Sequence, residues 1–273
     1  MNYRHAFHAG NFADCMKHAL LVRLLAALAA KPRPFFVLDT HAGPGAVDLG
    51  AAEASRTLEW QGGIGRLRGA APPAPLTSYL ALAGTGATYP GSPALIRALL
   101  RPGDRLACCE LHAEDHAALR RRFGADPQVG VHRRDGYAAI KALLPPPERR
   151  GLILIDPPFE AEDEFTRLVA ALQTGLARFP SGVFAAWCPI KHRAPIRDFF
   201  AALADARLRD LIAAELWLRA PLDPTRLNGC GLLVANPPWG FAEDASLILD
   251  VLRDALAERG RGEGNAVLRL ADE

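Results

Sequence analysis

Cysteine is scarce in this sequence, and long hydrophobic runs are absent. There are five cysteines among 273 residues, and two of them, Cys108 and Cys109, are adjacent. Five cysteines cannot all pair, which excludes a secreted disulfide scaffold and predicts a reducing, cytoplasmic environment. The apolar segment 19–30 resembles part of a signal peptide, but Arg23 interrupts it and it is shorter than the ~20 residues that span a bilayer. We therefore expect neither export nor membrane contact.

A strong net charge of either sign is also missing. Lys and Arg together number 32, and Asp and Glu number 30, which leaves a formal net charge of +2 at pH 7. This balance neither demands nor excludes a nucleic-acid partner. The distribution is more informative, because residues 1–34 are locally basic and a second basic cluster runs through residues 120–150. The second cluster is also typical of an ordinary solvated face.

Two common catalytic patterns are missing as well. No GxSxG sequence is present, so a hydrolase nucleophile has no support. No CxxC pair is present either. Cys109 and His116 are close in sequence and could be considered as metal ligands, but Cys109 belongs to a predicted strand and His116 to a predicted helix. The sequence therefore predicts no metal site.

Apolar runs alternate with segments of helical periodicity. The apolar runs predict buried strands at residues 34–40, 105–110, 151–155, 182–187 and 231–235. The periodic segments predict helices at residues 113–123, 165–179 and 195–208, and a first helix that Asn11 or Asp14 caps and that ends at about Ala30. This alternation predicts an α/β fold, a mostly parallel Rossmann-like sheet with helices on both faces.

The first two predicted strands are about sixty residues apart, which is more than a simple crossover requires. We therefore expect a single domain over residues 1–273 with a small, partly helical subdomain inserted at about residues 48–90.

The loop after the first predicted strand reads DTHAGPG over residues 39–45. Two glycines at the carboxyl end of a strand allow a tight turn and close approach of a ligand, in the crevice where α/β sheets bind cofactors. The third glycine of a dinucleotide fingerprint is missing, because Asp48 stands there, and this disfavours a pyrophosphate ligand. The loop alone is also compatible with a plain tight turn.

Acidic residues follow two later elements. Glu110 ends the second predicted strand, where a carboxylate can accept hydrogen bonds from both hydroxyls of a ribose. Asp135 can accept from an adenine amino group, and Gly136 beside it can leave room for the ring. Each signal is weak alone, since strand-end acids and Asp-Gly turns are common on protein surfaces.

The sharpest motif is DPPF at residues 156–159, directly after a buried strand. Two prolines stiffen the turn and fix the Asp156 carboxylate and the Pro157 carbonyl as hydrogen-bond acceptors. Phe159 adds a ring face. Two acceptors and one ring suit the exocyclic amine of a flat base, which they can hold in line with an electrophilic methyl group.

A second motif of the same shape, NPPW, covers residues 236–239. It follows the last predicted strand, so it should lie farther from the glycine-rich loop than DPPF does. We expect this turn to be structural, with Trp239 lining the substrate entrance.

The beginning of the sequence narrows the assignment. YRHAFHAGNFAD over residues 3–14, followed by Lys17 and His18, resembles the opening signature of the RlmJ family of bacterial 23S ribosomal RNA adenine-N6-methyltransferases. The resemblance extends to DTHAGPG, YPGSP at residues 89–93, ELH at residues 110–112, RRGLILIDPPF at residues 149–159, and NPPW. It therefore covers nearly the whole chain.

The resemblance implies a class I methyltransferase fold and S-adenosylmethionine as the methyl donor. It also implies a cytoplasmic monomer that methylates an adenosine N6 in 23S ribosomal RNA before the subunit is fully assembled. Asp156 matches the family's catalytic acceptor, with Pro157 and Phe159 beside it, and Tyr3 and Arg4 belong to an N-terminal motif, residues 1–18, that contacts RNA. The positions that match its cofactor site are His18, His41, Ser92, Glu110, Asp135, Gly136 and Asp156.

One departure and two alternatives remain. The family usually has Tyr after DPP, whereas this sequence has Phe159, so stacking is kept but any contact of the hydroxyl is lost. A DNA adenine methyltransferase would use the same amine chemistry. A catalytically silent RNA-binding module would retain the fold, although the intact DPPF and Glu110 argue against it.

Overall fold

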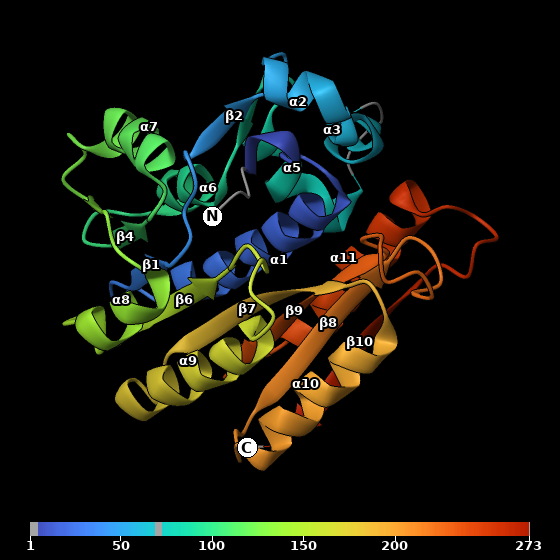
Figure 1. Ribbon diagram of the computed structural model, residues 1–273. Coiled ribbons are helices and arrows are strands. Elements are labelled where there is room, and N and C mark those ends of the chain that lie inside the picture. The colour runs from blue at the N-terminus through green and yellow to red at the C-terminus, as the bar shows by residue number, and fades with distance from the viewer. Residues whose placement is uncertain (1–4, 69–72, 273) are drawn as a thin grey trace.

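The computed structural model describes residues 5–68 and 73–272, and a twisted sheet forms its centre (Figure 1). In this part of the chain, eight strands form one sheet. From one edge to the other its strands are β5 (Val129–His132), β4 (Arg105–Cys109), β1 (Phe36–Asp39), β6 (Gly151–Ile155), β7 (Val183–Ile190), β9 (Gly229–Ala235), β8 (Leu211–Trp217) and β10 (Gly264–Ala271).

The sheet is parallel from β5 through β4, β1 and β6 to β7. Beyond β7 the direction alternates, because β9 is antiparallel to both β7 and β8, and β10 is antiparallel to β8. The predicted α/β fold with a mostly parallel sheet is confirmed. Of the strands in this sheet, the sequence analysis did not find β5, β8 or β10.

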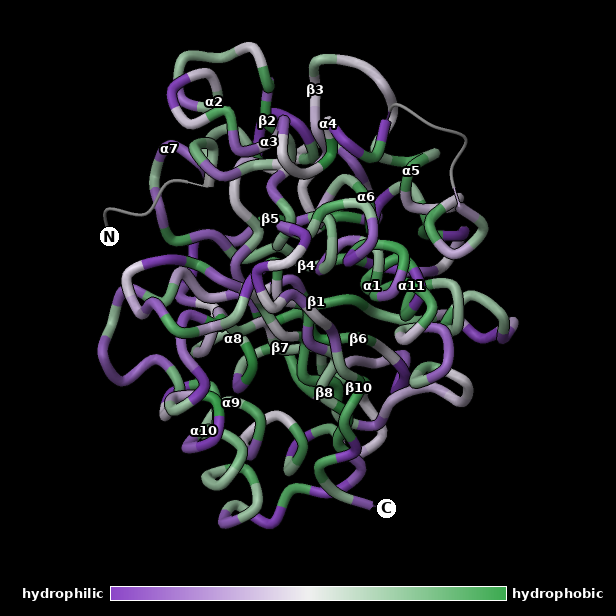
Figure 2. Tube along the Cα trace, turned by 90° about the vertical axis from the view of Figure 1, so that its right-hand side faces the viewer, coloured by the Kyte–Doolittle hydropathy of each residue, from purple (hydrophilic) through white to green (hydrophobic). Residues whose placement is uncertain are grey.

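Helices cover both faces of the sheet. One face carries α1 (Phe12–Ala29), α6 (Ser92–Leu99), α7 (Ala113–Phe123) and α11 (Phe241–Leu256); the other carries α8 (Gly136–Leu143), α9 (Glu164–Arg178) and α10 (Arg193–Asp205). Each layer buries its own apolar cluster against the sheet. In Figure 2, hydrophobic residues lie along the central strands and hydrophilic residues lie in the outer loops.

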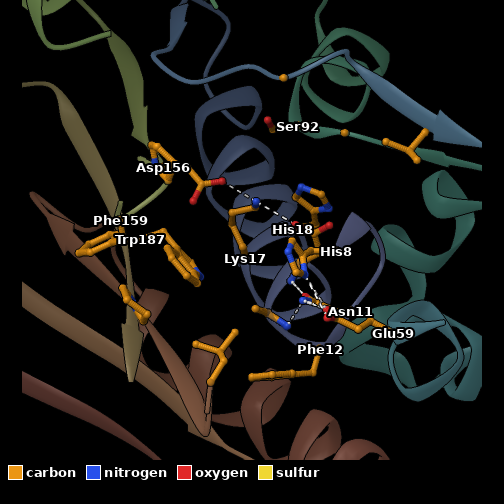
Figure 3. Close-up of a pocket in the computed structure, with 18 of the residues that line it drawn as sticks. His8, Asn11, Phe12, Lys17, His18, Glu59, Ser92, Asp156, Phe159 and Trp187 are labelled. Atoms are coloured by element: carbon orange, nitrogen blue, oxygen red, sulfur yellow. Dashed lines mark hydrogen bonds and ion pairs between the residues drawn. The ribbon is translucent and has the colours of Figure 1, made fainter. Parts of the chain in front are cut away.

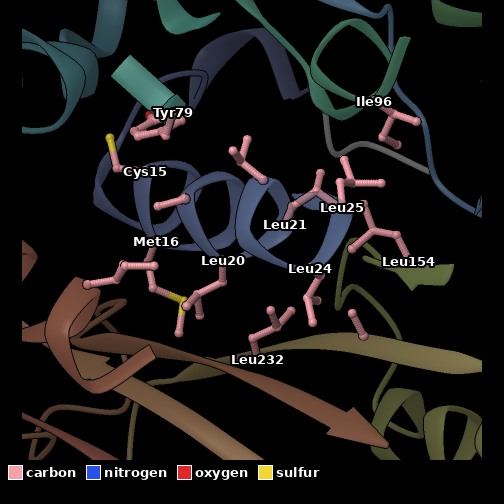
Figure 4. Packing of buried hydrophobic residues seen from close by; sticks show 14 of the residues in the cluster. Cys15, Met16, Leu20, Leu21, Leu24, Leu25, Tyr79, Ile96, Leu154 and Leu232 are labelled. Carbon is pink, nitrogen blue, oxygen red and sulfur yellow. The ribbon is translucent and has the colours of Figure 1, made fainter. Parts of the chain in front are cut away.

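Helix α1 is buried on nearly all sides, which determines where the polar groups of the site lie. Asn11 caps it, accepting hydrogen bonds from the backbone N–H groups of Ala13 and Asp14. Figure 4 shows Met16 on the side of α1 that faces Leu232 of β9, and α1 also packs against α6 and α11. A charged residue on this helix therefore has little access to water and needs a partner inside the protein.

Between β1 and β4 the chain forms a small layer of short elements, here called the inserted layer, whose buried residues share the hydrophobic cluster of α1 and α11. Its elements are β2 (Ala46–Asp48), α2 (Ala52–Thr57), α3 (Glu59–Gly62), α4 (Ile64–Leu67), the 3-10 helix η2 (Ala74–Leu76), α5 (Thr77–Ala83) and β3 (Thr88–Pro90), with β2 and β3 paired antiparallel. A Cβ at Gly63 would lie 2.2 Å from the Gly10 carbonyl oxygen, so the backbones of this layer and of the segment before α1 are in close contact.

The chain before α1 forms a short 3-10 helix, η1 (His5–Phe7). Tyr3 and Arg4 lie outside the described residues. Among the helices of residues 5–68 and 73–272, none combines the length and apolar character that crossing a membrane requires.

Candidate active site

A cavity of about 690 Å³ opens at the carboxyl ends of the parallel strands, beside the beginning of α1 (Figure 3). Its walls come from α1, the loop after β1, the ends of β4, β6 and β7, and the inserted layer. The predicted site residues that line it are His18, His41, Ser92, Glu110, Asp156, Pro157 and Phe159. The topology thus brings residues from five separate parts of the sequence to one place.

An ion-pair network connects α1 to the DPPF turn. Lys17 Nζ lies 2.5 Å from Asp156 Oδ2 and 2.9 Å from Asp14 Oδ1. Asp14 Oδ2 in turn accepts a hydrogen bond from the Gly10 backbone N–H, at 2.9 Å. The Lys17 side chain is only 6% exposed, so the network is shielded from solvent. It fixes the position of one Asp156 oxygen, and the other, Oδ1, has no hydrogen-bond partner among residues 5–68 and 73–272 and can accept from a ligand.

The Lys17 ammonium stays charged throughout the neutral range. Burial by itself lowers the pKa of Lys17, but the carboxylates of Asp14 and Asp156 outweigh burial, and the net effect raises that pKa above its ordinary value. The sequence analysis gave Lys17 no role. One sequence feature could have indicated this pair. Asp14 and Lys17 lie three residues apart in a helix that is otherwise mostly apolar, so both are expected to be buried and to pair with each other.

The DPPF turn places an aromatic wall next to the acceptors. Phe159 has a positive φ of 49°, which turns the chain sharply after the two prolines. Its ring packs edge-on against Phe165, at 5.0 Å between centroids, and against Trp187, at 5.8 Å. Figure 3 shows Phe159 and Trp187 side by side near Asp156. The flat substrate base expected from the sequence would therefore meet two aromatic rings.

Glu110 holds the glycine-rich loop and keeps capacity for a ligand. Its Oε2 accepts from the Gly43 backbone N–H at 2.8 Å, and its Oε1 accepts from the His112 N–H at 2.7 Å. A carboxylate has about four acceptor sites, so Glu110 keeps acceptor capacity for a ribose hydroxyl. Gly43 has a φ of +59°, and a Cβ there would meet no atom within 4 Å. The loop backbone is thus open to close approach of a cofactor.

His41 is a neutral imidazole in this site. Burial lowers its pKa to about 4. The Thr40 hydroxyl donates to the Leu154 carbonyl, and its oxygen lies 2.8 Å from His41 Nδ1. Because that hydroxyl proton is already used, Thr40 accepts from His41 Nδ1–H, and Nε2 becomes an acceptor.

Ser92 and His18 are each held by a buried partner. The Ser92 hydroxyl donates to Asp39 Oδ2 at 2.7 Å, and burial raises the pKa of Asp39 to about 7. His18 Nδ1 lies 2.9 Å from the Tyr89 hydroxyl, which is itself 3.0 Å from that of Tyr79. The inserted layer, which carries both tyrosines, therefore sets the orientation of a predicted cofactor residue. The sequence analysis placed Asp39 in the DTHAGPG motif and Tyr89 in the YPGSP motif but gave neither residue a role in the site.

Asp135 and Gly136 do not line the cavity. Asp135 is the N-cap of α8, where its Oδ1 accepts from the Ala138 N–H at 2.8 Å, and Arg167 lies 3.8 Å from Oδ2. Gly136 packs closely against the loop after β1, since a Cβ there would lie 2.2 Å from the Thr40 carbonyl oxygen and 2.8 Å from the His41 ring. The roles of Asp135 and Gly136 toward an adenine ring stay a prediction.

The NPPW turn lies at the other end of the strands from the cavity, near the beginning of β7. Because β9 is antiparallel to β7, its last residue, Ala235, pairs with Phe184 near the start of β7. Asn236 donates from Nδ2 to the carbonyls of Pro180 and Gly182, both at 2.7 Å, which is a structural role. Trp239 is 98% exposed there, so the expectation that it lines the substrate entrance is wrong.

Sequence comparisons give the same picture as the geometry. The model of the RsmJ family, described as ribosomal RNA large subunit methyltransferase D, RlmJ, matches residues 32–268. The chain belongs to this family. It is 38% identical over 269 residues to ribosomal RNA large subunit methyltransferase J of Escherichia coli (strain K12), with 96% of each chain covered. The corresponding enzyme of Haemophilus influenzae is 37% identical over 270 residues, with the same coverage.

A solved structure shares the fold of this chain over nearly its whole length. A protein of Legionella pneumophila, LPL1258, is 33% identical and superposes with a TM-score of 0.87, covering 96% of this chain and 98% of that one. The predicted family and its methyltransferase class are confirmed, and with them S-adenosylmethionine as cofactor. The open backbone at Gly43 and the unused acceptor sites of Glu110 fit this group.

The first testable consequence concerns Glu110. We expect Glu110→Ala to weaken S-adenosylmethionine binding by about 1–3 kcal/mol, because hydrogen bonds to buried hydroxyls are lost and the Gly43 N–H loses its acceptor. Isothermal calorimetry measures the affinity, and a melting curve shows whether the fold is kept. Unchanged affinity in a folded variant would remove Glu110 from the cofactor site.

Proposed function

We propose that this protein transfers a methyl group from S-adenosylmethionine to the exocyclic N6 of a specific adenosine in 23S ribosomal RNA. The observation that carries the proposal is the Asp156 carboxylate, which Lys17 holds at 2.5 Å beside the aromatic rings of Phe159 and Trp187. This arrangement accepts hydrogen bonds from an amine and stacks a flat base in the same place. Membership of the RlmJ family supports the RNA substrate.

The chain contributes to the reaction mainly through position and electrostatics. When bound, S-adenosylmethionine supplies an electrophilic methyl group. Asp156 Oδ1 and the Pro157 carbonyl accept the two N6 hydrogens, which orients the nitrogen lone pair and favours the charge that develops on the amine. Lys17 keeps the carboxylate in place, because it is held on its other side by Asp14.

The aromatic wall restricts what can enter. A base that stacks on Phe159 has its ring plane held in the orientation in which its amine can donate to Asp156 and Pro157. A base held only by its phosphates would not have its ring plane held in this way. Because Phe159 has no hydroxyl, its contribution is stacking alone. We infer that the DPPF turn selects for an exposed amine on a flat ring.

The N-terminal motif, residues 1–18, is proposed to hold the RNA. Tyr3 can stack on a base and Arg4 can bind a phosphate, and such stacking contributes about 1–3 kcal/mol per base. We expect Tyr3→Ala to lower RNA methylation by about tenfold or more while the cofactor affinity and melting temperature stay near those of the wild type. A fall in melting temperature with normal RNA affinity would instead make the motif structural.

A substrate competition assay tests the proposed function. Purified protein is incubated with methyl-labelled S-adenosylmethionine and either 23S ribosomal RNA or adenine-containing DNA, and the nucleosides are separated by liquid chromatography. The proposal expects N6-methyladenosine from the RNA and little product from the DNA. Preferential labelling of DNA would favour a DNA adenine methyltransferase, and cofactor binding without product on either polymer would favour a silent RNA-binding module.

The proposal extends to where and in which form the enzyme works. We propose that it acts as a monomer in the cytoplasm, on 23S ribosomal RNA before the large subunit is fully assembled. The burial of the site supports this timing, because Asp156 lines the cavity with its side chain only 17% exposed, and an adenosine has to leave its helix to reach it. Packed ribosomal RNA would resist that movement.

A further inference from the structure

The cavity continues beyond Asp156, away from the glycine-rich loop. Past Phe159 and Trp187 its wall includes the end of β7, the loop that joins β8 to β9, residues 218–228, and Leu256 and Glu258 at the end of α11. The cofactor residues lie on the other side of Asp156. This far half therefore faces the part of the substrate that extends beyond the target base.

Two cations line this half without a close partner. Lys191, just after β7, is exposed and has no ion-pair or hydrogen-bond partner for its ammonium in the described parts of the chain. Arg226 has a single distant contact, 3.7 Å from Glu258, and that carboxylate already forms a much shorter ion pair with Arg219. A cavity wall that keeps two cations available is suited to an anionic ligand.

The backbone that carries the two cations is held rigidly by one buried residue. Asn228 is completely buried, and its Nδ2 donates to the carbonyls of Lys191 and Asp223, each at 2.7 Å. Its backbone N–H donates to Ile190 at 3.1 Å. The end of β7 and the β8–β9 loop are thus tied together, and the two cationic side chains start from a fixed platform. Ordering these backbones on binding then costs little conformational entropy.

We propose that Lys191 and Arg226 bind backbone phosphates of the RNA strand on either side of the target adenosine. The inference rests on the proposed function and specifies how that substrate is held. Phosphates are the anions that RNA presents next to every base, and phosphate contacts set the register of a protein on its nucleic acid. Asn228 acts as a positioning residue, because it ties both cationic segments to each other.

The test is the double variant Lys191→Gln/Arg226→Gln, assayed on 23S ribosomal RNA over a range of salt concentrations. Two lost phosphate contacts should raise the KM for RNA by about tenfold at moderate salt, and should reduce the slope of log KM against log salt by about one to two. The dissociation constant of S-adenosylmethionine should not change. The charge-conserving variant Lys191→Arg/Arg226→Lys should restore most of the affinity for RNA.

The matched control removes two charges elsewhere. Arg207→Gln/Arg209→Gln changes two exposed arginines just before β8, at the opposite edge of the sheet, and should leave the KM and the salt slope unchanged. An equal effect in this control, or no effect in the Lys191 and Arg226 variant, would overturn the inference. Lys191→Gln alone, which disturbs no buried group, repeats the test if the double variant is unstable.

The proposed function and this inference fail in different ways. If the wild-type protein does not form N6-methyladenosine on ribosomal RNA, the proposed function is wrong. If the wild type forms it and the double variant has the wild-type KM and salt slope, only the phosphate contacts are wrong.

Discussion

Asp156→Ala is expected to abolish methyl transfer, with a loss of more than about a thousandfold, while S-adenosylmethionine still binds and the fold is retained. The fold is retained because Lys17, which loses Asp156 as a partner, still pairs with Asp14, and because Asp156 Oδ1 accepts no hydrogen bond from the described residues. Asp156→Asn should retain a trace of turnover, since an amide oxygen still accepts one hydrogen bond. Single-turnover assays with saturating cofactor measure both variants.

Trp239→Phe is the control for this prediction, because Trp239 belongs to the second proline turn. Trp239 lies at the other end of the strands from the cavity and is 98% exposed. We therefore expect the variant to have near-normal turnover. If Trp239→Phe were more damaging than Asp156→Ala, the wrong proline turn would have been assigned to the amine.

Lys17→Met is expected to lower methyl transfer by about a hundredfold and also to destabilise the protein. Removing the lysine leaves two carboxylates, Asp14 and Asp156, without their shared cation, and breaking a buried ion pair costs about 3–5 kcal/mol. Melting temperatures of the variant and the wild type measure the destabilisation.

Asp14→Asn separates the positioning role of Lys17 from its structural role. This variant removes one carboxylate from the same network but keeps the contact between Lys17 and Asp156, and the amide oxygen can still accept from Gly10. We expect a lower melting temperature with most of the turnover retained. Equal losses of turnover in Lys17→Met and Asp14→Asn would show that Lys17 acts through stability alone.

The parts of the fold that the sequence predicted are those with strong local signals. The strand at residues 151–155 and the helix at residues 113–123 have the predicted bounds, because each is a clear apolar run or periodic segment between chain breakers. β8 was missed because LIAAELW is rich in alanine, leucine and glutamate, which favour a helix. Pairing with β9 and β10 on both sides overrides that preference.

The site likewise contains residues that the sequence predicted and contacts that it could not predict. Asp156 and Glu110 could be predicted because each directly follows a buried strand, where ligands bind in α/β folds. The contact between Lys17 and Asp156 joins residues far apart in sequence and depends on how α1 crosses the sheet, which no local pattern reports. The short helices of the inserted layer were equally out of reach, because helices of four to seven residues are stabilised by packing more than by their own sequence.

Mass-spectrometric mapping of N6-methyladenosine in 23S ribosomal RNA tests the central claim most directly. Ribosomal RNA is compared from the parent strain, from a strain lacking this protein, and from that strain with either the wild type or Asp156→Ala restored. The account predicts one adenosine that loses its N6-methyl group in the deletion strain and regains it with the wild type but not with Asp156→Ala. An unchanged methylation map in the deletion strain, or full restoration by Asp156→Ala, would contradict it.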